Sequence, residues 1–203
     1  MEDEKKINEY KKKVTNGDLN ALVNLCLYIP KNEAFEWIKK VLAEHKDDPF
    51  VYYHVARAYD EIDGCEKDKI KYMKKHLSIN PCHSDGYWTL GNYYYEMDQW
   101  EEAEECYLKG IAYRDNDDYR CFASLGSMYY HYMRKYGEAE TLLLKAIEGN
   151  QEDELALETL GRLYFEKKCN QKALENLEKA RRLYDENESL DEEIEEVKKL
   201  MDD

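Results

Sequence analysis

One small residue returns at a constant interval along this 203-residue chain. Four similar segments, YYHVARAYDE, YWTLGNYYYE, FASLGSMYYH and LETLGRLYFE, carry it at their fifth position, as Ala56, Gly91, Gly126 and Gly161. Each step between these positions is 35 residues. Three equal steps indicate a repeated structural unit, because a single irregular core has no reason to return to one spacing.

The apolar residues around each small residue fall on one face of a helix. In the second segment, Tyr87, Leu90, Gly91 and Tyr94 follow the i, i+3, i+4, i+7 spacing of an amphipathic helix. A second helical stretch, such as WEEAEECYLKGI, comes after a short loop. Helices joined by a short loop pack as antiparallel neighbours, so each unit is predicted to be a helix pair.

The small residues are expected where two helices cross. A glycine inside a helix costs about 1 kcal/mol relative to alanine. That cost is offset where two backbones approach closely and gain packing contacts. We therefore predict such a crossing at each small residue, for example between Gly91 and Ala103.

These motifs resemble the tetratricopeptide repeat family, whose units read Leu-Gly-x-x-Tyr and then alanines on the second helix. Copies of Leu-Gly-x-x-Tyr begin at Leu90, Leu125 and Leu160. The copy at Leu125 has one extra residue between its helices, in YHYMRKYGEA. The segments from Tyr52 and from Ala21 are weaker copies, and the opening of the latter, NGDLNALVNLCLYI, is also similar to a Sel1-like repeat.

The resemblance implies an all-α fold, a right-handed α-solenoid of about five antiparallel helix pairs with a C-terminal capping helix. Residues 1–17 would form an N-terminal helical extension and residues 18–185 the repeat domain. Its units would span about 18–48, 49–82, 83–117, 118–152 and 153–185. Residues 186–203 would form the capping helix, for which Ser189-x-x-Glu192 predicts a capping box and Leu190, Ile194, Val197 and Met201 an apolar face.

The resemblance also implies a concave groove lined by the first helix of each pair, and hence a non-catalytic adaptor, scaffold or co-chaperone that binds a partner peptide or helix. The groove residues predicted to bind the partner are Tyr53, Arg57, Trp88, Asn92, Tyr95, Arg120, Tyr130, Arg162 and Phe165. Aromatic and arginine side chains are the usual anchors of protein contacts. Tyr95, Tyr130 and Phe165 could instead pack between neighbouring repeats. Among the positions at which the family holds an acidic chaperone tail, only Asn92 carries a suitable residue, which disfavours that ligand.

Charge narrows the class of partner. Lys and Arg number 30 against 45 Asp and Glu, a formal net charge of −15. Without a basic stripe, nucleic-acid binding is disfavoured, although the 35-residue step is also that of the RNA-reading pentatricopeptide family. The alternative function is an acidic inhibitor or immunity-type protein that neutralises a basic protein. No apolar run approaches the roughly 20 residues that span a bilayer, so no membrane partner is expected.

The cysteines and histidines give no catalytic or metal pattern. The six cysteines are scattered without a CxxC pair, and the N-terminus has no apolar stretch, so reduced thiols in a cytoplasmic protein are expected. A metal site from Cys65, His76, Cys82 and His83 lacks the paired spacing typical of such sites. We therefore predict no enzymatic activity, cofactor or metal; the sequence does not indicate the oligomeric state.

Overall fold

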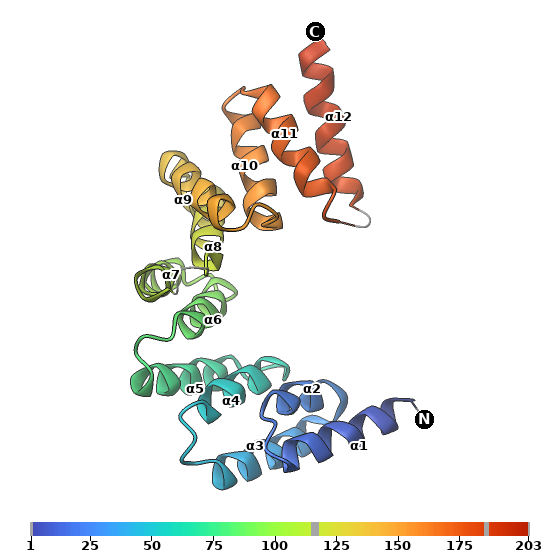
Figure 1. Ribbon diagram of the computed structural model, residues 1–203, viewed down its shortest axis with the longest axis vertical. Coiled ribbons are helices and arrows are strands. Elements are labelled where there is room, and N and C mark those ends of the chain that lie inside the picture. The colour runs from blue at the N-terminus through green and yellow to red at the C-terminus, as the bar shows by residue number, and fades with distance from the viewer. Residues whose placement is uncertain (1, 115–117, 185–186, 203) are drawn as a thin grey trace. The chain divides into compact units, whose positions relative to one another are not determined.

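The computed structural model describes residues 2–114, 118–184 and 187–202. In this part of the chain there are twelve α-helices, one π-helical turn and no strand (Figure 1), so the all-α prediction is confirmed. Contacts divide the chain into two compact units, one ending at Ala103 and the other beginning at Glu104. No helix among the described residues is both long and apolar enough to cross a membrane.

The helices follow one another with short connections. The first seven are α1 (Glu2–Thr15), α2 (Asn20–Tyr28), α3 (Lys31–Glu44), α4 (Val51–Asp60), α5 (Glu66–Ile79), α6 (Ser84–Tyr95) and α7 (Trp100–Tyr113). The others are α8 (Arg120–Met128), the π-helical turn η1 (Tyr129–Met133), α9 (Tyr136–Gly149), α10 (Glu154–Glu166), α11 (Asn170–Arg181) and α12 (Glu188–Asp202). Two consecutive α-helices lie within each of the five predicted repeat ranges.

In the first compact unit, α1 packs on α2, and α2 contacts α3 and α4. The core between them includes Leu22, Leu25, Ile38 and Val55, which have no exposed surface. Val14 of α1 joins this core. The predicted N-terminal extension is therefore a packed helix, held by burial of its apolar side.

In the second compact unit, α8 packs on α9, and α10 packs on α8, α9 and α11. A β-carbon added to Gly126 of α8 would lie 2.8 Å from Leu143 Cγ and 3.3 Å from the carbonyl oxygen of Ala139. A β-carbon added to Gly161 of α10 would lie 2.7 Å from Leu177 Cγ. Both glycines thus occupy equivalent crossings with the following helix, which confirms the predicted register at these two positions.

The extra residue after Gly126 is accommodated by a change of helix type. The carbonyl of Tyr129 accepts a hydrogen bond from Lys135 N, six residues later, at 3.0 Å. In the next pair, the equivalent carbonyl of Tyr164 accepts one from Cys169 N, five residues later, at 2.9 Å. The added residue therefore widens one turn into η1, as is typical of a single insertion in a helix, and carries Tyr130 in that turn.

The last helix, α12, packs against α11 and buries Leu190, Ile194 and Val197, as its spacing predicts. Its start differs from the prediction. The side chain of Asn187 accepts the hydrogen bond of Leu190 N at 3.1 Å, so Asn187 caps the helix and the predicted capping box at Ser189 is wrong. Met201 is 42% exposed and lies outside the buried face, because it is in the last turn of the helix.

Candidate partner-binding site

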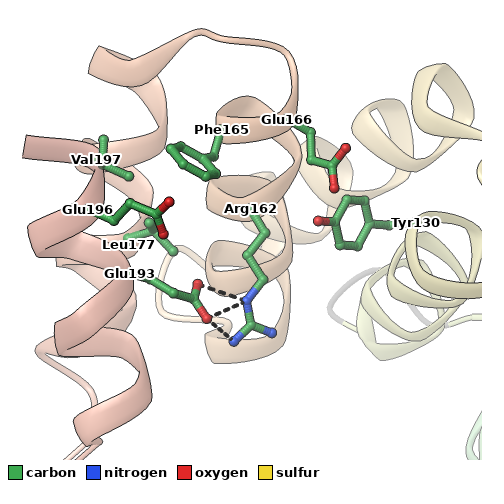
Figure 2. A pocket seen from close by; sticks show the side chains of 8 residues that line it. All are labelled: Tyr130, Arg162, Phe165, Glu166, Leu177, Glu193, Glu196 and Val197. Carbon is green, nitrogen blue, oxygen red and sulfur yellow. Dashed lines mark hydrogen bonds and ion pairs between the residues drawn. The ribbon is translucent and has the colours of Figure 1, made fainter. Parts of the chain in front are cut away.

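An open pocket of about 190 Å³ lies in the second compact unit, where η1 and three helices meet (Figure 2). It contains three of the residues predicted to bind a partner, Tyr130, Arg162 and Phe165. The other lining residues are Glu166 of α10, Leu177 of α11, and Glu193, Glu196 and Val197 of α12.

The helix geometry explains why these side chains meet. Arg162 and Phe165 are three residues apart on α10 and therefore lie on one face. Glu193 and Val197 are four apart on α12, with Glu196 beside them, and present a second wall. Tyr130 comes from η1 of the preceding helix pair and lies on the opposite side of Arg162 from Glu193 in Figure 2.

Arg162 joins α10 to α12. Its Nε lies 2.9 Å from one carboxylate oxygen of Glu193, and its Nη2 lies 2.7 Å from the other. The same Nη2 lies 2.8 Å from Glu158, one turn earlier on α10. This two-pronged contact is the strongest arginine–carboxylate geometry, and the hydrogen bonds to Glu193 raise the pKa of the Arg162 guanidinium. The charge of Arg162 is thus balanced within the protein.

Besides the carboxylates of Glu166 and Glu196, the rest of the pocket lining is apolar and aromatic. Leu177 and Val197 form the floor, each only 1% exposed. Phe165 and Tyr130 are half-buried, so each ring both packs and contributes to the pocket wall. Burial, with Glu166 nearby, raises the pKa of the Tyr130 hydroxyl and keeps it neutral at physiological pH.

The structure places the remaining predicted site residues elsewhere. In the first compact unit, Tyr53 is buried and its hydroxyl donates a hydrogen bond to Asp85, while the Arg57 guanidinium lies 5.7 Å from the centre of its ring. The Tyr95 ring lies edge-on to Trp100 with centroids 5.3 Å apart. Trp88 and Asn92 are half-buried on α6, and Arg120 is exposed and paired with Asp118 at the start of α8.

A histidine pair lies beside Tyr53 in the first compact unit. His76 is fully buried, with its Nδ1 3.2 Å from the carbonyl of Pro49 and its Nε2 2.9 Å from His83 Nδ1. Nδ1 also lies 3.3 Å from the Asn80 side-chain nitrogen, which only donates, so the neutral ring has partners for either tautomer. Burial lowers the pKa of His76 to about 4. Among the described residues, no group of three or more potential ligands could hold a metal ion.

Sequence reasoning missed the contribution of α12. Glu193 and Glu196 lie outside the apolar face predicted for this helix, and polar residues outside such a face are typical of the end of a solenoid. Glu193 is four residues before Val197, and Glu196 directly precedes Val197. This spacing is the only sequence signal that places the two glutamates near the edge of the buried face. The contact of Glu193 with α10 depends on how α12 packs, which the local pattern does not specify.

Comparison with known proteins identifies the fold. Residues 84–117 match the sequence profile of the tetratricopeptide repeat family. No curated protein matches the chain. Among solved structures, MamA is 22% identical and covers 86% of this chain and 93% of its own, with a TM-score of 0.65. PilF of Pseudomonas aeruginosa is 16% identical over 91% of this chain and 78% of its own, with a TM-score of 0.68.

A third structure, YrrB, is described as a tetratricopeptide repeat protein with an unusual peptide-binding site. It is 19% identical over 72% of this chain and 74% of its own, with a TM-score of 0.60. At this level of identity the likenesses show the fold, which is the α-solenoid type built from consecutive helix pairs.

Proposed function

We propose that this chain, a tetratricopeptide repeat protein, is a non-catalytic module which binds a peptide or helix of another protein. The family match over residues 84–117 and the likeness in fold to MamA support this proposal. Proteins of this family typically lack catalytic activity and generally bind proteins or peptides. The peptide-binding site named for YrrB supports the same class of ligand here. The pocket between α10 and α12 is the proposed centre of contact.

The observation that carries this proposal is the size and lining of that pocket. Its volume of about 190 Å³ is below the roughly 300–1,000 Å³ of typical small-molecule sites and suits a single side chain. Two half-buried aromatic rings, Phe165 and Tyr130, stand beside an apolar floor. Partly exposed aromatic side chains around a side-chain-sized pocket are typical of the anchoring centre of a protein contact.

Replacing Phe165 by alanine should weaken partner binding at least tenfold. The ring supplies a wall of the pocket, and loss of a central aromatic anchor costs about 1.4 kcal/mol or more. The ligand is first selected from a displayed library of random dodecapeptides on the wild-type chain. Its affinity for wild type and Phe165→Ala is then measured by calorimetry, with circular dichroism to verify equal helix content.

The matched control is Leu144→Ala. Leu144 is an apolar side chain of α9 in the same compact unit, 47% exposed and outside the pocket. Its loss should leave the peptide affinity unchanged. Failure to enrich any peptide, or equal affinity of the selected peptide for Phe165→Ala and wild type, would contradict the proposed function.

The acidic-inhibitor alternative has one observation in its favour, the net charge of −15. Salt separates the two functions. The association rate of a peptide that binds in the aromatic pocket should change less than tenfold between about 0.1 M and 1 M salt. Over this range the screening length falls from about 10 Å to about 3 Å. Association governed by the whole acidic surface should instead slow steeply over this range. Stopped-flow measurement of the association rate of the selected peptide at the two salt concentrations distinguishes the two functions.

A further inference from the structure

We propose that the pocket takes a basic side chain, arginine or lysine, from the partner. In this arrangement the aliphatic stem lies on the apolar floor formed by Leu177 and Val197, and the cationic head reaches the carboxylates of Glu166 and Glu196. The inference rests on the proposed function and adds the chemical class of the residue that enters the pocket.

The first argument for a basic side chain is the balance of charge among the residues that line the pocket. Four charged residues line it, of which three are glutamates and one is Arg162. Arg162 and Glu193 satisfy one another through two parallel hydrogen bonds. Within the described ranges neither Glu166 nor Glu196 forms an ion pair or a hydrogen bond. Two uncompensated negative charges therefore remain at the pocket.

These two charges distinguish between possible occupants. An acidic side chain would be repelled by both glutamates. A neutral apolar side chain would fit the floor but would partly desolvate the carboxylates without compensating them, which costs free energy. A cation compensates that cost, and because both carboxylates are exposed it can pair with a glutamate while its own head group stays near water.

The second argument is the apolar floor of the pocket, which favours a cation with a long aliphatic stem. Leu177 and Val197, with the half-buried rings of Phe165 and Tyr130, line the pocket with apolar atoms, and a small polar cation has no apolar part to pack on them. Arginine and lysine have long aliphatic stems that pack on apolar surface while the charged head stays near water. Figure 2 shows Glu166 and Glu196 on opposite sides of the Phe165 ring, so a head group beside the ring can also gain from cation–π attraction.

The test uses the full chain with methyl-labelled leucine and valine, titrated with Nα-acetyl-arginine methylamide near physiological salt. The Leu177 and Val197 methyl resonances should shift and saturate, with an affinity in the millimolar range expected of so small a ligand. The citrulline derivative has the same shape without the charge and should bind at least tenfold more weakly. The glutamate derivative should not shift these resonances.

The protein side of the test is the double variant Glu166→Gln/Glu196→Gln. It should lose at least tenfold in affinity for the arginine derivative and keep its affinity for the citrulline derivative. Glu148→Gln/Glu192→Gln makes the same change in net charge at two exposed positions outside the pocket and should bind arginine as wild type does.

The inference is overturned if citrulline binds as tightly as arginine, if the Glu166→Gln/Glu196→Gln variant keeps the arginine affinity, or if none of the derivatives shifts Leu177 and Val197. Each of these results leaves the proposed function to its own test. A peptide that loses affinity for Phe165→Ala would still establish the pocket as a partner site, with a neutral or acidic residue inside it.

Discussion

A leucine in place of Gly126 is expected to lower the free energy of unfolding by about 2 kcal/mol. Its β-carbon alone would lie 2.8 Å from Leu143 Cγ and 3.3 Å from the backbone oxygen of Ala139, so α8 and α9 have to move apart. Overpacking of this kind costs about 1–3 kcal/mol or more, and the better helix propensity of leucine returns less than about 1 kcal/mol. Urea unfolding followed by circular dichroism measures the difference.

The control for this substitution is Gly137→Ala in α9. No atom lies within 4 Å of the β-carbon that it would add, so only helix propensity and chain entropy change. The variant should gain a few tenths of a kcal/mol and at most about 1 kcal/mol. If Gly126→Leu unfolded at the same urea concentration as wild type, α8 and α9 would not cross at that residue.

Acidification from pH 6.5 to pH 4 is expected to cost the fold about 2.5 kcal/mol through His76. Its pKa is about 4 in the folded chain because of burial, against about 6.5 for an ordinary histidine. Between these values the unfolded state binds more protons, so stability is full above pH 6.5 and is lost as pH falls towards 4. His83, His54 and Asp85 also face this ring and contribute smaller effects.

The comparison that isolates His76 is urea unfolding of wild type and His76→Gln at a series of pH values. Glutamine keeps one donor and one acceptor group for the polar neighbours of His76, but it does not titrate. The difference in free energy of unfolding between the two chains should narrow by about 3 kcal/mol on going from pH 7 to pH 4. A constant difference, or an NMR titration of His76 near pH 6.5 in the folded chain, would contradict this account.

The helix pairs were predictable because the necessary information is local. Spacing of apolar residues defines each amphipathic helix, and the short loops between helices bring consecutive ones together. Gly126 and Gly161 could be placed at crossings from sequence alone, since a costly residue inside a helix needs a packing reason. The π-helical turn at Tyr129 was visible only as one extra residue, because sequence does not show whether a loop or a helix takes up an insertion.

The site was predictable only in part. Tyr130, Arg162 and Phe165 follow from their positions on the first helix of each pair, and the structure brings them together. The ion pair between Arg162 and Glu193 depends on the packing of α12, which no repeat motif encodes. Tyr53 was expected to face a groove, yet it packs beside Asp85, the buried His76 and the half-buried His83. His76 is on the second helix of the same pair, whereas His83 and Asp85 are at the start of the next pair, and the local repeat pattern does not show that these groups meet.

The most direct test of the binding site is a set of intermolecular nuclear Overhauser effects between the selected peptide and the methyl-labelled chain. The pocket account predicts contacts from one peptide side chain to the methyl groups of Val197 and Leu177, the two residues of its floor. Contacts confined to exposed methyl groups such as those of Leu144, with none at Val197 or Leu177, would contradict it.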